Sequence, residues 1–349
     1  MSTTTTAPVI PAYTKKDFES GVDPRWCPGC GDYSIINQVQ RALPSAGVAR
    51  ENIVFVSGIG CSSRFPYYMH NYGMHTVHGR APSFAAGLKL SRPELQVWVV
   101  TGDGDALAIG GNHFIHALRR NIDIKILMFN NRIYGLTKGQ VSPTSELGKK
   151  TKTTPHGSPD YPFNPPALAL GAGGTFVARS IDVEGAHLGA VVQAAQAHKG
   201  TAYVEIYQNC PVFNDGAYQN LTDKTVKADR QLRMEHGKPL LFGKDMKKGI
   251  RFDPRTAHLE VVTVGENGVK EADILVHDAH RDDPTLAFML ANLDQAPGFP
   301  TPIGVFRDVR RPTVDEITWQ LVGEAKAAAK KQLSVPEFLA QGETWTVKG

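Results

Sequence analysis

Long apolar runs are missing from this sequence. No stretch of about 18 or more consecutive apolar residues occurs, so the sequence predicts no membrane-spanning helix. The first eleven residues are rich in Thr and Pro and lack the apolar run of a secretory signal peptide. We therefore expect a cytoplasmic protein with no membrane association.

The sequence also lacks a strong charge of either sign. Its 349 residues carry 38 basic and 34 acidic side chains, a formal net charge of +4. A balance this small does not favour nucleic acid as a partner. Hydrophobic residues make up 41% of the chain, enough for one large α/β domain, with or without an extension.

Cysteine is scarce. The chain has four cysteines, Cys27, Cys30, Cys61 and Cys210. In a reducing compartment disulfides are the weaker interpretation. All four lie in turns that contain Gly or Pro, whereas structural core cysteines lie more often inside strands or helices. We therefore interpret them as ligands.

Short β-branched runs alternate with helical patterns along the first two thirds of the chain. Five runs are predicted to be buried strands: Ile53–Ser57, Gln96–Thr101, Ile124–Asn130, Thr175–Ala178 and Ala202–Tyr207. Helical patterns lie at Ala81–Leu90 and Ala186–His198. Between residues 107 and 118, one helical face is shared by Leu107, Gly111, Phe114, Ile115 and Leu118. Such alternation predicts an α/β fold, a mostly parallel sheet with helices on both faces.

Polar motifs follow these strands at their ends. Cys61 comes after the first strand, Gly102-Asp103-Gly104-Asp105 after the second, Asn130-Asn131 at the end of the third, and Cys210 after the last. In open parallel sheets ligands gather beyond the carboxyl ends of the strands. We therefore expect these motifs to share one edge of the sheet.

The composition suggests three segments: a tail over 1–20, a binding domain over 21–215, and a C-terminal extension over 216–349. Leu136–Pro166 is expected to be a long functional loop. In the extension, a small βα-like unit is predicted from Glu260–Val264, Ile274–His277 and Pro284–Leu293. Thr313–Gln332 is predicted to be a terminal helix, with Thr313 as its cap and Glu316 three residues on.

The Gly-Asp-Gly motif suits a diphosphate and a metal ion. Glycines let the backbone approach a ligand closely, and a following helix N-terminus offers N–H groups to phosphate. Asp103 supplies a carboxylate oxygen of the kind that Mg²⁺ prefers, and Asn131 reaches the same edge from the next strand. Each motif alone is as readily a plain turn; their combination is more specific.

The four cysteines suit either a [4Fe–4S] cluster or a structural zinc. Cys27 and Cys30 form a local pair, whereas Cys61 and Cys210 are isolated in the sequence. Zinc modules usually use two local pairs, so this spacing favours a cluster held between loops of a folded domain.

Several segments together resemble the β subunits of 2-oxoacid:ferredoxin oxidoreductases, which bind thiamine diphosphate. The resemblance covers roughly residues 20–215. The segments that carry it are Trp26-Cys27-Pro28-Gly29-Cys30-Gly31, Gly58-Ile59-Gly60-Cys61-Ser62-Ser63-Arg64, His78-Gly79-Arg80-Ala81, Gly102-Asp103-Gly104, the run from Asn130 to Gln140, Ser142-Pro143-Thr144 and Asn209-Cys210-Pro211.

This resemblance implies a set of cofactors and ligands. Mg²⁺ would be held by Asp103, by the Asn131 side chain and by the backbone carbonyl of Ile133, and the four cysteines would hold a [4Fe–4S] cluster. Thiamine diphosphate would lie against Gly60, Ser62, Gly102, Asp103, Gly104, Asp105, Asn131, Ile133, Gly135 and Leu136.

The resemblance also implies a reaction and partners. A 2-oxoacid would be oxidatively decarboxylated, coenzyme A would take the acyl group, and electrons would pass through the cluster to ferredoxin. The glutamate that activates thiamine diphosphate would come from an α subunit, because no acidic residue here has an obvious claim to that role.

Three further side chains are weaker catalytic candidates. Arg64 could pair with the substrate carboxylate, Lys138 could contact phosphate or substrate, and His78 could hydrogen-bond cofactor or substrate. For Arg64 and Lys138 an exposed, solvated side chain is an equally good interpretation.

The substrate is predicted from resemblance alone. Ser158–Pro165 and Pro302–Arg307 resemble β subunits of the 2-oxoglutarate type, which would make succinyl-CoA, with pyruvate or a branched-chain 2-oxoacid as alternatives. Two further alternatives stay open: a non-redox thiamine-dependent decarboxylase with a zinc site, and a non-catalytic interaction module stapled by a metal.

Overall fold

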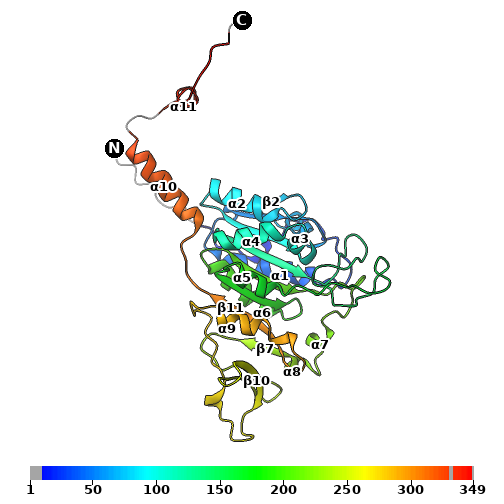
Figure 1. The fold of residues 1–349 in the computed structure, drawn as a ribbon. Coiled ribbons are helices and arrows are strands. Elements are labelled where there is room, and N and C mark those ends of the chain that lie inside the picture. Colours follow the sequence, from blue (N-terminus) through cyan, green and yellow to red (C-terminus); the bar gives the residue numbers. More distant parts are fainter. Residues whose placement is uncertain (1–9, 330–332, 348–349) are drawn as a thin grey trace.

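An eight-stranded sheet forms the centre of the protein (Figure 1), in a computed structural model that describes residues 10–329 and 333–347. In spatial order its strands are β2 (Tyr72–His75), β1 (Ile53–Ser57), β3 (Gln96–Gly102), β4 (Ile124–Asn130), β6 (Ala202–Tyr207), β5 (Phe176–Ile181), β11 (Thr301–Asp308) and β7 (Gln231–Met234). The strands from β2 to β5 run parallel, whereas β11 is antiparallel to β5 and β7 is parallel to β11. The predicted α/β fold with a mostly parallel sheet is confirmed.

Side chains alternate between the two faces of the sheet, as the pleat requires. On β1, for example, Val54 and Val56 belong to one core cluster and Ile53 and Phe55 to the other. Both faces are therefore buried, which explains why these strands read as continuous apolar runs.

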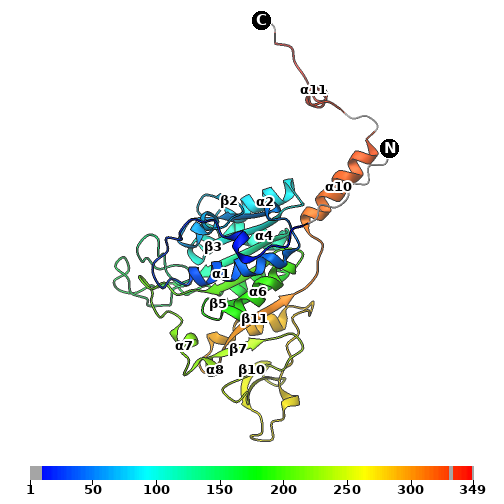
Figure 2. The same cartoon turned by 180° about the vertical axis from the view of Figure 1, so that it is seen from behind.

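Helices cover both faces (Figures 1 and 2). One core cluster takes in residues of α2 (Ala81–Ser91), α4 (Gly111–Arg120), α5 (Pro165–Gly171) and α9 (Thr285–Ala291). The other takes in α1 (Asp32–Ala42) and α6 (Gly185–Ala197). The shorter helices are α3 (Asp103–Leu107), α7 (Gln219–Thr222), α8 (Lys227–Arg230) and α11 (Val335–Leu339), with 3₁₀ turns at η1 (Lys15–Phe18), η2 (Leu43–Ala46), η3 (Arg50–Asn52), η4 (Ser62–Tyr68), η5 (Glu271–Asp273) and η6 (Leu293–Gln295).

The helical face predicted over 107–118 is divided in the structure. α3 ends at Leu107 and α4 begins at Gly111, with a turn between them. A Cβ on Gly110 would lie 2.4 Å from the backbone oxygen of Asp105. The chain therefore turns here at a point of close backbone approach.

The predicted βα-like unit is wrong. Residues 258–263 form β10 (His258–Thr263) of a separate antiparallel sheet with β9 (Lys248–Asp253) and β8 (Leu241–Phe242). The segment predicted as a strand at Ile274–His277 makes only an isolated bridge between Pro239 and Val276. The helical part of the prediction corresponds to α9.

The central sheet continues into the C-terminal extension. Both β7 and β11 come from beyond residue 215, and they complete the edge of the sheet next to β5. The division predicted at residue 215 therefore does not coincide with a break in the sheet.

A long helix, α10 (Val314–Ala328), extends away from the sheet in both views (Figures 1 and 2). The predicted capping box is confirmed, since the Thr313 side chain accepts from the Glu316 N–H at 3.2 Å. The predicted helix ran to Gln332, but residues 330–332 lie outside the described part of the chain. Near its start, Asp315 accepts from the Asp123 N–H and Trp319 Nε1 donates to the Leu90 carbonyl.

Within residues 10–329 and 333–347, no helix has both the length and the apolarity needed to cross a membrane.

Candidate functional site

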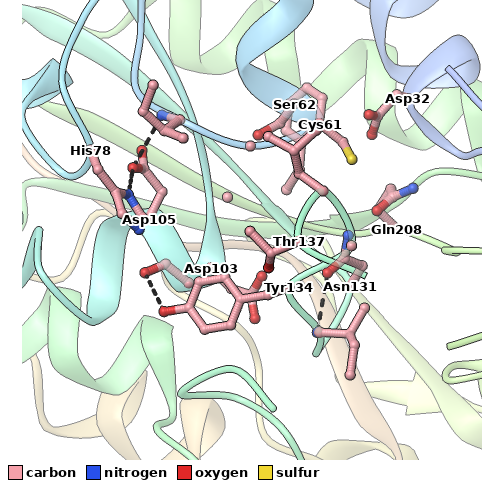
Figure 3. A pocket seen from close by; sticks show the side chains of 18 residues that line it. Asp32, Cys61, Ser62, His78, Asp103, Asp105, Asn131, Tyr134, Thr137 and Gln208 are labelled. Atoms are coloured by element: carbon pink, nitrogen blue, oxygen red, sulfur yellow. Dashed lines mark hydrogen bonds and ion pairs between the residues drawn. The ribbon is translucent and has the colours of Figure 1, made fainter. Parts of the chain in front are cut away.

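A cavity opens at the carboxyl ends of β1, β3 and β4 (Figure 3), and we name it the Gly-Asp-Gly cavity. The structure places all ten of the predicted cofactor-binding residues in its wall. These are Gly60, Ser62, Gly102, Asp103, Gly104, Asp105, Asn131, Ile133, Gly135 and Leu136, together with the catalytic candidate His78. The shared sheet edge inferred from strand order is thus present.

Asp103 opens α3 at the floor of this cavity and is 2% exposed. Its Oδ2 accepts hydrogen bonds from Ser142 Oγ at 2.6 Å and Thr144 Oγ1 at 2.5 Å. Burial nevertheless raises the pKa of the Asp103 carboxyl to about 6, because these neutral donors offset only part of the desolvation. A buried carboxylate with hydroxyl partners but no salt-bridge partner suits a cation.

Asn131 and Ile133 line the same cavity from the end of β4. The Asn131 side-chain oxygen accepts from the Ile133 N–H at 3.2 Å, which curls the chain over the cavity. Tyr134 then crosses to Gly104 and donates to its backbone oxygen at 3.1 Å. A Cβ on Gly104 would lie 2.2 Å from the Tyr134 ring, so only glycine fits there.

Asp105 serves to hold loops together. Its Oδ1 accepts from the N–H groups of Ile59 at 3.1 Å and Gly79 at 2.7 Å, and its Oδ2 accepts from Thr101 Oγ1 at 2.6 Å. His78 Nδ1 also contacts Asp105 Oδ1 (Figure 3). Asp105 therefore fixes the two loops that carry Gly60 and His78.

The four cysteines line a second cavity next to the first, the cysteine cavity. A Cβ on Gly135 would lie 3.5 Å from Cys210 Sγ and 3.7 Å from Cys61 Sγ. The glycine thus leaves open a space between the two sulfurs that any other side chain would enter. The two cavities share part of their walls, namely Cys61, Asn131, Gly135, Leu136 and Gln208.

The thiols are free and buried to different extents, from exposed Cys27 to buried Cys210. Burial raises the pKa of Cys61 to about 11 and that of Cys30 further still, so without a metal these two thiols stay protonated. Thiolate ligation here therefore requires the positive charge of a metal. In the described part of the chain, no group of three or more His, Cys, Asp or Glu side chains is arranged to hold one metal ion.

The structure separates the three weaker candidates. Arg64 and Lys138 line the cysteine cavity, and neither lines the Gly-Asp-Gly cavity. Arg64 is held there by a hydrogen bond from its Nη1 to the Arg25 carbonyl at 2.8 Å. His78, in contrast, lies beside Asp105 in the first cavity.

Sequence reasoning missed several residues of the first cavity. Asp32 lines it, and its Oδ1 is buried with no hydrogen-bond partner among the described residues. Burial raises the pKa of Asp32 to about 7. Gln208 also lines the cavity, with its Nε2 3.1 Å from Cys30 Sγ, and was likewise assigned no role; its signal was proximity to Cys210. Ser142 and Thr144 contact Asp103 without lining the cavity, and they were quoted only within a segment of the resemblance.

Comparison with known proteins decides the family. Residues 58–206 match the family described as thiamine pyrophosphate enzyme, C-terminal TPP binding domain. The chain is 52% identical over 338 residues to the 2-oxoglutarate oxidoreductase subunit KorB of Mycobacterium tuberculosis, covering 95% of this chain and 88% of that protein. The chain belongs to the 2-oxoglutarate:ferredoxin oxidoreductase β subunits.

Two further relatives agree with this assignment. A 2-oxoacid:ferredoxin oxidoreductase subunit beta from Saccharolobus solfataricus is 46% identical over 203 residues, 58% of this chain and 67% of that protein. A solved 2-oxoglutarate:ferredoxin oxidoreductase from Magnetococcus marinus, with 2-oxoglutarate, coenzyme A and succinyl-CoA bound, superposes with a TM-score of 0.74. It is 32% identical, and the match covers 95% of this chain and 98% of that chain. The family predicted from the motifs is confirmed, as is a thiamine-diphosphate-binding domain.

Proposed function

We propose that this β subunit, together with an α subunit, catalyses the coenzyme A-dependent oxidative decarboxylation of 2-oxoglutarate to succinyl-CoA, and passes the electrons through a [4Fe–4S] cluster to ferredoxin. The observation that carries the proposal is that the Gly-Asp-Gly cavity and the cysteine cavity adjoin and share Cys61 and Gly135. One-electron oxidation of a bound substrate requires two such sites side by side. The same arrangement allows reductive carboxylation in the reverse direction.

Asp103, the Asn131 side chain and the Ile133 carbonyl are the proposed Mg²⁺ ligands. The buried carboxyl of Asp103, whose pKa is raised to about 6, fits a cation that compensates its charge. Gly102, just before α3, and Gly104, inside its first turn, let the backbone approach the diphosphate closely. His78, held by Asp105, faces the same cavity and is proposed to hydrogen-bond cofactor or substrate.

The four cysteines are the proposed cluster ligands. Cys61 and Cys210 are isolated in the sequence and meet only in the folded domain, beside Gly135, which supports a cluster over a zinc module built from two local pairs. From the side of the cysteine cavity, Arg64 remains a candidate for contacting the substrate carboxylate, and Lys138 for contacting phosphate or substrate.

Thiamine diphosphate would supply a nucleophilic carbon and an electron sink, and an iron–sulfur cluster would accept single electrons. The residues of this chain bind and orient these groups. The acidic residues lining the Gly-Asp-Gly cavity are Asp32, Asp103 and Asp105, and no described glutamate lines it. This supports an α subunit that provides the activating glutamate and part of the substrate and coenzyme A site.

An anaerobic spectrum tests the proposal. The chain would be co-expressed with its α subunit, purified without oxygen, and its visible absorbance recorded while 2-oxoglutarate and then coenzyme A are added. A brown protein that bleaches with 2-oxoglutarate is expected. A colourless protein would contradict the cluster, and bleaching with pyruvate alone would contradict the substrate.

A further inference from the structure

A buried ion pair outside every motif discussed so far lines a cavity separate from the Gly-Asp-Gly cavity. Arg179 on β5 donates from Nε to Glu205 Oε2 on β6 at 2.6 Å. Their side chains are 2% and 0% exposed. Removing two charges from water carries a desolvation cost that their attraction need not repay, so such a pair is weak evidence for stability alone. Its contacts indicate a different role.

Glu205 orients the side chain of Asn130, the last residue of β4. Glu205 Oε1 accepts from Asn130 Nδ2 at 2.8 Å. An ionised carboxylate only accepts hydrogen bonds, so it fixes which end of the amide faces it. The amide oxygen, Asn130 Oδ1, therefore faces the opposite way, where it accepts from the Arg132 N–H at 3.1 Å and lies 2.9 Å from Thr144 Oγ1.

Thr144 has a single hydroxyl proton, which it can donate to Asn130 or to Asp103 but not to both. Its Oγ1 is 2.9 Å from Asn130 Oδ1 and 2.5 Å from Asp103 Oδ2. Asn130 and Thr144 are 2% and 4% exposed, and both line the same cavity as Arg179 and Glu205. Because Thr144 and Ser142 converge on the same oxygen of Asp103, they fix the rotation of its carboxylate.

We propose that the Arg179–Glu205 pair is a positioning unit for the turn that carries the proposed Mg²⁺ ligands Asn131 and Ile133. It acts through Asn130, whose amide oxygen accepts from the Arg132 N–H inside that turn. The inference rests on the proposed roles of Asn131 and Ile133 as Mg²⁺ ligands. Arg179 Nη1 also lies 3.4 Å from Asp294 Oδ2 and from the Pro302 carbonyl. The C-terminal extension thereby takes part in holding the metal side of the site.

The substitution Glu205→Gln disturbs this unit at one point. In one orientation the glutamine oxygen faces Asn130, and the glutamine NH₂ group then faces the Arg179 donor. In the other orientation the glutamine oxygen faces Arg179, and the glutamine NH₂ group then faces the NH₂ group of Asn130. In either orientation two donors oppose each other, so the Asn130 amide loses its fixed direction. Lys125→Met is the matched control, since Lys125 belongs to a buried ion pair with Asp123 at the other end of the same strand, β4.

The test measures Mg²⁺ affinity in the complete complex with its α subunit. After removal of Mg²⁺ by a chelator, Mg²⁺ would be titrated at saturating thiamine diphosphate, with quenching of tryptophan fluorescence as the signal and circular dichroism confirming the fold. Glu205→Gln is expected to weaken Mg²⁺ binding about tenfold or more, the range seen when outer partners of metal ligands are lost. Excess Mg²⁺ should restore turnover, and Lys125→Met should stay within about twofold of the unsubstituted protein.

The outcomes separate this inference from the proposed function. Asp103→Asn should abolish Mg²⁺-dependent binding, and retained binding would overturn the ligand assignment itself. Loss with Asp103→Asn but an affinity within twofold for Glu205→Gln would overturn the positioning role. If Glu205→Gln does not fold, Glu205→Gln combined with Arg179→Met removes both charges together; weakened Mg²⁺ binding in that protein supports the role and unchanged binding overturns it.

Discussion

The two edges of the central sheet both bury aspartates, in opposite electrostatic settings. At the amino edge, Asp123 contacts the ammonium groups of Lys125 and Lys199 at 2.8 Å and Lys89 at 3.3 Å. Although burial raises its pKa, these charges bring the pKa of Asp123 well below the ordinary 3.8. At the carboxyl edge, burial dominates and raises the pKa of Asp103 to about 6.

The difference lies in what each edge leaves unsatisfied. The amino edge pairs each charge with a counter-charge from the same chain, as expected of a structural network. The carboxyl edge keeps the buried carboxyls of Asp32 and Asp103 without cationic partners, and burial keeps the thiols of Cys30 and Cys61 protonated. A buried ionisable group whose pKa is shifted toward 7 is typical of a functional site that binds a ligand or metal.

The largest expected effect is at the cysteine cavity. Cys61→Ser should lower the bound iron severely and reduce ferredoxin-linked turnover by about a thousandfold or more, since a ligand of the proposed cluster is lost. Iron analysis and the visible spectrum measure this. Lys125→Met, at the amino edge, should keep its iron; equal iron in both variants would contradict the assignment.

A pair of matched aspartate substitutions tests the comparison directly. Asp103→Asn should abolish Mg²⁺-dependent thiamine diphosphate binding and leave the metal-free protein as stable or about 1–2 kcal/mol more stable, because a costly buried charge is removed. Asp123→Asn should leave binding unchanged and lower the free energy of unfolding by about 3 kcal/mol, because it leaves buried lysines unpaired. Calorimetric titration and chemical denaturation give the two readouts.

That comparison breaks if the outcomes are exchanged. Either of two results would contradict it: loss of binding in Asp123→Asn at full stability, or loss of stability in Asp103→Asn. Each would show that a buried carboxyl without a cationic partner does not identify the cofactor site.

Two buried threonines sharpen the same contrast with smaller effects. Thr144→Val removes a donor to Asp103 and should weaken Mg²⁺ binding several-fold. Thr175→Val removes the hydroxyl that lies 2.7 Å from Asn121 Oδ1 and 2.9 Å from His198 Nε2 at the amino edge. It should cost about 1–2 kcal/mol of unfolding free energy with Mg²⁺ affinity unchanged. Mg²⁺ titrations and urea unfolding of both variants measure these effects. Weaker Mg²⁺ binding in Thr175→Val than in Thr144→Val would contradict the contrast between the two edges.

The smallest effect concerns a partly buried histidine outside both cavities. Burial, together with the charge of Arg233, lowers the pKa of His187 from 6.5 to about 4. As the pH falls below 6.5 the unfolded chain takes up a proton that the folded protein excludes until about pH 4, so stability is lost across this window. In His187→Gln that loss should shrink by about 1–2 kcal/mol.

Urea midpoints of the metal-free chain at pH 7 and pH 5 measure it. An unchanged pH dependence in His187→Gln would show that the ring is not held neutral.

The parallel part of the fold was predictable because its strands are buried on both faces. The ranges Ile53–Ser57, Ile124–Asn130 and Ala202–Tyr207 agree with the structure residue for residue, since β-branched runs leave little ambiguity. β11 was missed because Pro302 and Gly304 interrupt its apolar pattern, and antiparallel pairing with β5 compensates for them.

The site was predictable where its residues lie in motifs and unpredictable where only the fold brings residues together. Asp103, Asn131 and the cysteines stand in recognisable local patterns. Glu205 and Arg179 lie in the middle of strands, where a sequence gives no sign that two charges face each other across neighbouring strands. Asp32 reads as an ordinary helix-start residue, and only its burial without a partner distinguishes it.

The helix α10 is joined to the body near its start, by Asp315 and by the hydrogen bond from Trp319, and then leaves the sheet (Figure 2). A helix of this length is marginal in water without packing, since its last turns gain only their own hydrogen bonds. Amide hydrogen exchange in the chain alone should therefore be graded along the helix. The amides of the first turns should be protected, and those near Ala328 should exchange quickly.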